Sequence, residues 1–280
     1  MPRIRVVSKA TVVLAMAAMI AGCAGSQPPT QPGTTLASEE AATASPTLDP
    51  ASNPSVEGRF AVGGMELALV CWGEGSPTVI LETGGANIEE WTGSGMVQVL
   101  ASTTRVCTYD RPGTGESDQP PDERRDADDA IATLQELLKV AEVEGPYVLL
   151  GRSFGGMIVT HYAAEQPDDV VGVVVLDTPA PSDEWSEADK EELAWDNPAN
   201  TERLDVLNGF EIRFAHDPPR FDLPLLLISP IPGEASPENE AFWLDSSPQA
   251  EQVTPACSEP TAGDCATEVL EFVRELASGG

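Results

Sequence analysis

The sequence has few basic residues and almost no histidine. Its 280 residues include 46 Asp and Glu against 15 Lys and Arg, for a formal net charge of −31, and the two histidines are His161 and His216. A chain this acidic repels nucleic acid and anionic lipid headgroups, so we expect no nucleic-acid partner. Because histidine is the usual general base near neutral pH and the usual metal ligand, its scarcity limits both kinds of site.

The first residues contain an apolar run that is too short to span a bilayer. Residues 1–9 are basic, and residues 10–22 are uncharged and largely apolar, which predicts a signal peptide over residues 1–22. Ile20-Ala21-Gly22-Cys23 resembles the bacterial lipoprotein signal, which implies cleavage before Cys23 and acylation of that cysteine. An ordinary secretory leader is the alternative. A lipid anchor would hold the protein on the extracytoplasmic face of the cell membrane, in the cell envelope.

Aromatic and basic residues are absent between the predicted leader and the rest of the chain. Residues 24–57 consist largely of Ser, Thr, Pro, Ala and Gly. Such a segment cannot bury enough apolar surface to offset its ordering entropy, so residues 23–57 are predicted to be a disordered tether. One domain is predicted over residues 58–280.

Export favours disulfide bonds between the remaining cysteines. If Cys23 carries lipid, four are left, and four cysteines allow three pairings. Cys257 and Cys265 lie in one loop-like stretch, where a local bridge is easy, and this leaves Cys71 to pair with Cys107 on two expected strands. Four unpaired thiols are the alternative. Neither CxxC nor HxxxH spacing occurs, so no metal site is predicted.

Short apolar segments alternate with segments of helical periodicity. Strands are expected at residues 59–62, 65–72, 78–81, 105–109, 147–150, 171–176 and 223–228, and helices before residue 100, over 126–143 and after Gly151. Most of these strands are apolar throughout, so they are expected to be covered on both faces. Strand–helix–strand order then predicts an α/β fold with a mostly parallel sheet.

One motif in this pattern has chemical content. Gly151-Arg152-Ser153-Phe154-Gly155 matches G-x-S-x-G and lies between an apolar strand and a helix, as the nucleophile elbow requires. The glycines permit the tight turn that exposes the serine hydroxyl, and the amides of the following helix face developing negative charge. A purely structural turn between strand and helix is the alternative.

The elbow and three further segments resemble the α/β-hydrolase family, a superfamily of serine hydrolases. The first segment, Leu81-Glu82-Thr83-Gly84-Gly85, resembles the family's oxyanion loop. The second, residues 109–118, resembles the family's D-R-x-G-x-G-x-S-D loop, and the third, residues 174–179, resembles the sixth strand and its exit. The resemblance covers residues 58–276. It implies about eight strands with helices on both faces, a short lid at about 180–222, and no cofactor. It also implies Ser153 as nucleophile, the amides of Gly85 and Phe154 as oxyanion donors, and Asp110 and Arg111 as residues that hold loop geometry.

The sequence departs from the family at the general base. The family's histidine follows the last strand, but residues 252–260 contain none. His161 is eight residues beyond Ser153 on the next helix, roughly 12 Å along its axis, and is expected to pack against a neighbour or face solvent. His216 precedes an expected parallel strand and should lie at the end of the sheet opposite the elbow. It is the only candidate stand-in base.

Acidic residues offer several candidates for the carboxylate that would orient a base. Asp177, at the carboxyl end of an expected strand, is preferred, with a helix cap or loop anchor as the alternative. Glu234 and Asp245 follow the next strand, where the family more often places this acid. Residues 122–129 and 183–192 are typical of solvated helix faces.

Two functions follow from these observations. The first is a serine hydrolase that acts on a small ester, amide or related acyl substrate through Ser153, without efficient turnover because the histidine is missing. The second is a catalytically inactive hydrolase-fold protein of the cell envelope that binds a ligand. In either case we expect a monomer that contacts the membrane only through its lipid anchor.

Overall fold

The computed structural model describes residues 53–85, 87–182, 184–229, 236–254 and 263–279. The predicted signal peptide, Cys23 and most of the predicted tether lie outside these residues, as do Glu234 and Cys257. Within the described ranges, no helix is both long enough and apolar enough to cross a membrane.

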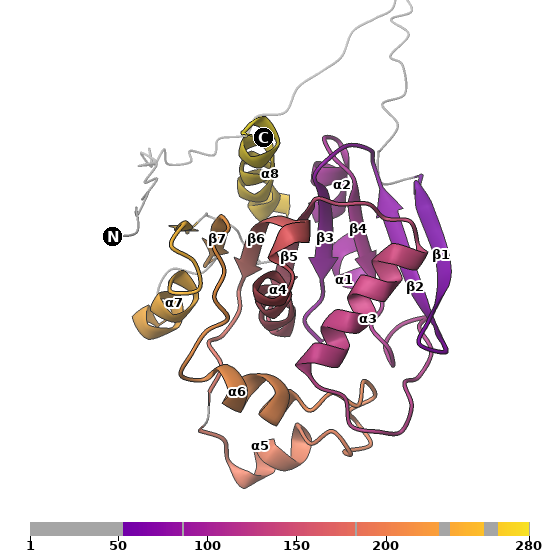
Figure 1. The fold of residues 1–280 in the computed structure, drawn as a ribbon, viewed down its shortest axis with the longest axis vertical. Coiled ribbons are helices and arrows are strands. Elements are labelled where there is room, and N and C mark those ends of the chain that lie inside the picture. Colours follow the sequence, from indigo (N-terminus) through magenta and orange to yellow (C-terminus); the bar gives the residue numbers. More distant parts are fainter. Residues whose placement is uncertain (1–52, 86, 183, 230–235, 255–262, 280) are drawn as a thin grey trace, which may run out of the picture. The chain divides into compact units, whose positions relative to one another are not determined.

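Eight strands form a single sheet (Figure 1). In chain order they are β1 (Val56–Val62), β2 (Met65–Trp72), β3 (Thr78–Glu82), β4 (Val106–Tyr109), β5 (Tyr147–Arg152), β6 (Val170–Leu176), β7 (Leu225–Ile228) and β8 (Ala250–Val253). Their spatial order is β1-β2-β4-β3-β5-β6-β7-β8. β1 and β2 pair antiparallel, as do β2 and β4, whereas all other neighbours are parallel. The predicted mostly parallel sheet of about eight strands is confirmed.

The first and last strands differ most from the prediction. β1 begins at Val56, inside the predicted tether, because Ser55 and Val56 continue the pairing with β2: the Ser55 amide and hydroxyl both donate to the Cys71 carbonyl, at 2.8 and 3.3 Å. β8 was not predicted as a strand. Glu251 and Gln252 make it polar and only partly buried, so its sequence lacks the apolar run that marks the inner strands.

Helices cover both faces of the sheet, as predicted. They are α1 (Glu89–Thr92), α2 (Met96–Ala101), α3 (Ala127–Val140), α4 (Phe154–Glu165), α5 (Glu187–Glu192), α6 (Ile212–Phe214), α7 (Pro237–Leu244) and α8 (Gly263–Ser278), with a 3₁₀ turn at Pro167–Asp169 and a π-helical turn, η3, at Leu207–Glu211. Leu149 belongs to the core beneath α3 and α4, whereas Val148 and Leu150 belong to the core beneath α2 and α8. Successive residues of β5 are therefore buried on opposite faces.

The predicted lid lies between β6 and β7. It contains α5, η3 and α6, and Figure 1 places α5 and α6 together, below α4 in this view. The capping box at Ser186 begins α5: its side chain accepts from the Asp189 amide, and the Asp189 side chain accepts from the Ser186 amide. Arg125, which precedes α3, forms a parallel bridge with Leu204 of the lid.

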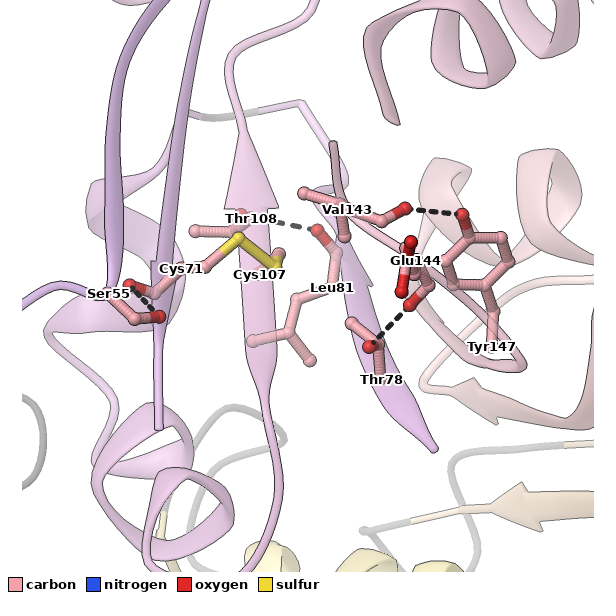
Figure 2. Close-up of a disulfide and its surroundings, with 9 residues drawn as sticks. All are labelled: Ser55, Cys71, Thr78, Leu81, Cys107, Thr108, Val143, Glu144 and Tyr147. Carbon is pink, nitrogen blue, oxygen red and sulfur yellow. Dashed lines mark hydrogen bonds between the residues drawn. A yellow bond between two sulfur atoms is a disulfide. The ribbon is translucent and has the colours of Figure 1, made fainter. Parts of the chain in front are cut away.

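Cys71 and Cys107 form a disulfide bond, as predicted (Figure 2). They face each other across the antiparallel pair β2 and β4, and both are buried. The Thr108 hydroxyl then ties β4 to β3 by donating to the Leu81 carbonyl, at 3.2 Å. Cys265 is also disulfide-bonded. Its predicted pairing with Cys257 stays a prediction, because Cys257 lies outside the described residues.

Candidate active site

Ser153 occupies a strained turn between β5 and α4. Its backbone has φ 52° and ψ −126°, in a region that residues with a side chain rarely adopt. The two outer glycines of the motif make this turn sterically feasible. A β-carbon on Gly151 would lie 2.2 Å from the Gly155 carbonyl oxygen, and one on Gly155 would lie 2.5 Å from the Glu82 carbonyl oxygen. The local geometry is that of a nucleophile elbow.

The Gly84–Gly85 loop lies against Ser153. A β-carbon on Gly84 would be 3.1 Å from Ser153 Cβ and 3.6 Å from the Ser153 hydroxyl oxygen. The Gly84 amide is already engaged, because it donates to Glu90 Oε2 at 3.2 Å. Among the described residues, no acceptor is found for the amides of Gly85 and Phe154, the two predicted oxyanion donors. Both residues line the same pocket as Ser153.

The Arg111 side chain holds the loop that contains Gly84 and Gly85. This buried guanidinium donates through Nη2 to the Gly84 carbonyl at 2.6 Å, and through Nη1 to the Thr83 carbonyl at 2.7 Å. Nη1 also forms an ion pair with Glu82 at 2.6 Å. The guanidinium therefore holds three consecutive residues that lead into the oxyanion loop.

Two carboxylates form ion pairs with the Arg111 guanidinium. Glu82, at the end of β3, also accepts from the Tyr109 hydroxyl at 2.6 Å, and Glu202 from the lid binds Arg111 Nε and Nη2 at 2.6 and 2.9 Å. Burial raises the pKa of Glu82, although Arg111 opposes that shift. Burial and the neighbouring Glu82 raise the pKa of Tyr109 well above its ordinary value. The cluster joins the sheet, the oxyanion loop and the lid.

Asp110 shapes the adjoining loop. Its Oδ1 accepts from the Ile88 amide and its Oδ2 from the Glu116 amide, both at 2.8 Å. Asp110 and Arg111 thus hold loop geometry, as the resemblance implied.

Ser153 lines a pocket of about 300 Å³ between the sheet edge and the lid. The wall is mostly apolar: besides Ser153, Gly84, Gly85 and Phe154, it comprises Met157, Pro179, Trp185, Leu193, Asn200, Glu202, Leu204, Val206 and Glu211. Its volume is at the lower end of the range for small-molecule sites. No histidine lines this pocket among the residues that the structure describes.

The two histidines lie elsewhere. His161 is buried in α4, where Nε2 is 2.8 Å from Asp128 Oδ1 and the ring centroid is 5.1 Å from that of Phe214. Burial lowers the pKa of His161. Its predicted role in helix packing is confirmed. His216 is exposed, between α6 and β7, and it does not line the Ser153 pocket.

The candidate acids have cationic partners. The Asp177 side chain is 44% exposed, and its Oδ2 lies 3.7 Å from Arg152 Nη2. Arg152 Nη1 in turn donates to Glu90 Oε1 at 2.9 Å, so the second residue of the elbow joins two carboxylates. Asp245 pairs with Arg220 at 2.7 Å. In this structure Asp177 therefore lies beside a guanidinium, and its φ of 47° is uncommon for a residue other than glycine.

Sequence reasoning missed three carboxyl groups around Ser153. Glu90 holds the Gly84 amide, Glu202 pairs with Arg111, and Glu211 lines the pocket. They are three among 46 acidic residues, and none belongs to a motif. No signal in the sequence alone distinguishes them from the acids of solvated helices.

Comparison with known proteins supports the same fold. Residues 77–209 match a protein family described as alpha/beta hydrolase fold. Among curated proteins, the probable transporter efuK of Hormonema carpetanum is 34% identical over 108 residues, which are 37% of this chain and 15% of that protein. The uncharacterized protein YqjL of Bacillus subtilis is 34% identical over 106 residues, 38% of this chain and 41% of that one. The alignments thus span less than half of either relative.

Solved structures match over most of the domain. DbjA aligns with a TM-score of 0.62 and 16% identity, covering 79% of this chain and 99% of that one. An esterase from Thermogutta terrifontis aligns with a TM-score of 0.59 and 18% identity, covering 79% and 98%. The epoxide hydrolase CorEH aligns with a TM-score of 0.62 and 13% identity, covering 80% and 99%. The chain therefore has the α/β-hydrolase fold.

Proposed function

We propose that the protein is a serine hydrolase that cleaves small ester or amide-type acyl substrates through Ser153. The observation that carries this proposal is the elbow itself: Ser153 has a positive φ, faces a pocket, and lies against a glycine loop. Fold neighbours that include an esterase and an epoxide hydrolase are consistent with hydrolytic chemistry.

The proposed reaction begins with attack of the Ser153 hydroxyl oxygen on the substrate carbonyl carbon. The hydroxyl proton passes to water, and the carbonyl oxygen acquires negative charge between the amides of Gly85 and Phe154. The C–O or C–N bond to the leaving group then breaks, the leaving group takes up a proton, and an acyl-Ser153 ester remains. Water cleaves this ester and restores the hydroxyl.

Turnover should be slow, because no histidine lines the pocket among the described residues. Loss of one member of a catalytic triad typically costs about four to six powers of ten in rate. The alternative function, a ligand-binding protein without chemistry, rests on the same observation. Substrates with good leaving groups distinguish the hydrolase from the binding protein, because cleavage of such substrates needs little help from a general acid.

We also propose that Cys23 carries the lipid anchor and that the protein works on the extracytoplasmic face of the cell membrane. The sequence Ile20-Ala21-Gly22-Cys23 supports this location. Metabolic labelling with an alkyne-bearing fatty acid should mark the wild-type chain and not Cys23→Ala. Equal labelling of the two chains would contradict the proposed site.

A fluorophosphonate probe tests the proposed activity. We expect the full-length chain to be labelled, and Ser153→Ala to remain unlabelled while it keeps the wild-type melting temperature. Turnover of p-nitrophenyl acetate that depends on Ser153 would reject the inert alternative. Absence of both labelling and turnover in the folded wild-type protein would reject the hydrolase.

A further inference from the structure

Glu211 is a buried carboxyl group in the wall of the Ser153 pocket. It ends the π-helical turn η3 in the lid, and only 7% of its surface is exposed. Glu202 is the other charged side chain among the described residues that line this pocket. The two carboxylates differ in how their charge is compensated.

Glu202 is fully engaged by protein. Both of its oxygens accept from Arg111, at 2.6 and 2.9 Å. A bidentate guanidinium of this kind occupies both carboxylate oxygens and fixes their orientation, although Arg111 also pairs with Glu82. Both oxygens of Glu202 are therefore already bound by protein.

Glu211 has no such partner. Its Oε2 accepts from the Ser182 amide at 2.8 Å, and no ion pair or second hydrogen bond of this carboxyl group is found within the described ranges. The nearest cation in sequence, Arg213, pairs with Asp128 of α3 at 3.0 Å. Among the described residues, the second oxygen of Glu211 thus has no protein partner, and the side chain lines the pocket.

Burial of a carboxylate without a counter-charge is costly, and it raises the pKa of Glu211. A cation placed beside the second oxygen would recover that cost, and it would do so in a wall that is mostly apolar. Trp185 lines the same pocket and offers an aromatic surface that also favours a cation.

Resting on the function proposed above, we propose that the pocket selects acyl substrates that carry a primary ammonium group, with Glu211 as the residue that binds this group. Attack at Ser153 and recognition at Glu211 then occur in one pocket of about 300 Å³. A volume of this size fits a short chain between ammonium and carbonyl. The substrate class is therefore a small amino-acyl ester or amide.

Two isosteric esters test this selectivity. p-Nitrophenyl 6-aminohexanoate and p-nitrophenyl heptanoate differ only in an ammonium group where the other has a methyl group. We expect the full-length protein to cleave the aminohexanoate with at least about tenfold higher kcat/KM, after subtraction of spontaneous hydrolysis, because a charge-assisted hydrogen bond contributes about that factor.

Glu211→Gln should bring this ratio close to one by lowering kcat/KM for the aminohexanoate. The amide still offers a carbonyl oxygen to the Ser182 amide, so the lid contact can persist. Glu192→Gln is the matched control, because it removes one negative charge from an exposed position in α5 and should keep the tenfold preference. Melting temperatures of both variants show whether the chain is folded.

Binding separates this proposal from the proposed hydrolase activity. The non-reactive amides 6-aminohexanamide and heptanamide can be titrated calorimetrically into Ser153→Ala and into Ser153→Ala/Glu211→Gln. Tighter binding of the amino compound that is lost in the double variant supports recognition by Glu211 even if neither ester is cleaved. Equal binding of the two amides to Ser153→Ala, or a preference that survives Glu211→Gln in a folded chain, would overturn the proposal.

Discussion

The backbone at Gly84 approaches Ser153 so closely that a β-carbon there would be 3.1 Å from Ser153 Cβ. For Gly85, one residue further, no atom of the described residues lies within 4 Å of an added β-carbon, and its φ is not positive. Two neighbouring glycines of the same loop therefore make different demands on the residue type.

We expect Gly84→Ala to lower Ser153-dependent fluorophosphonate labelling by about tenfold or more, because the new methyl group displaces the loop or the nucleophile. Gly85→Ala keeps the amide, and its methyl group meets no atom of the part of the chain that the structure describes, so the loss of labelling should be much smaller. The rate of labelling by the probe measures both variants. Equal rates for the two would show that loop position does not control reactivity at Ser153.

Much of this fold could be predicted because the inner strands are apolar on both faces. Leu149 packs into one core, and Val148 and Leu150 pack into the other. All three are therefore apolar, and the strand appears in the sequence as an uninterrupted apolar run. β8 escaped prediction because Glu251 and Gln252 are only partly buried and its position depends on pairing with β7. Long-range pairing of this kind leaves no local pattern.

Only the backbone turn of the candidate site could be predicted from the sequence. The steric needs of the elbow fix Gly151, Ser153 and Gly155 in a recognisable motif. Which carboxylate faces the pocket depends on the path of the lid, and the sequence of the lid offers many equivalent acids. The pairing of Asp177 with Arg152 could not be predicted either, because it joins the last residue of β5 to the residue that follows β6.

Removal of the Arg111 guanidinium should destabilise the whole domain. Arg111→Met leaves Glu82 buried beside an apolar side chain and frees Glu202, and loss of one partner from a buried ion pair typically costs about 3–5 kcal/mol. Urea unfolding measures the loss. Arg220→Met is the control, since Arg220 and Asp245 are both largely exposed, and its effect should be much smaller. A similar effect of the two substitutions would contradict a structural role for the buried cluster.

The disulfide bond should contribute measurably to stability. Cys71 and Cys107 are 36 residues apart in sequence, and closing a loop of that length restricts the unfolded chain by about 3–4 kcal/mol. The double substitution Cys71→Ala/Cys107→Ala should therefore lower the urea midpoint, and β2 should exchange its amide hydrogens faster. An unchanged midpoint would mean that the bridge adds no stability to the pairing of β2 with β4.

His161 should make stability depend on pH near and below neutrality. Its pKa is lowered in the folded protein, so as pH falls through about 6.5 the unfolded chain takes up a proton before the native one does. Stability from this residue is complete above the unfolded pKa and is lost as pH falls toward the folded pKa. Asp128, whose pKa is lowered by its bond to His161, contributes to the pH dependence only at lower pH.

We expect the melting temperature of wild type to fall more steeply from pH 7.5 to 5 than that of His161→Gln. Identical slopes for wild type and His161→Gln would contradict the assignment to His161.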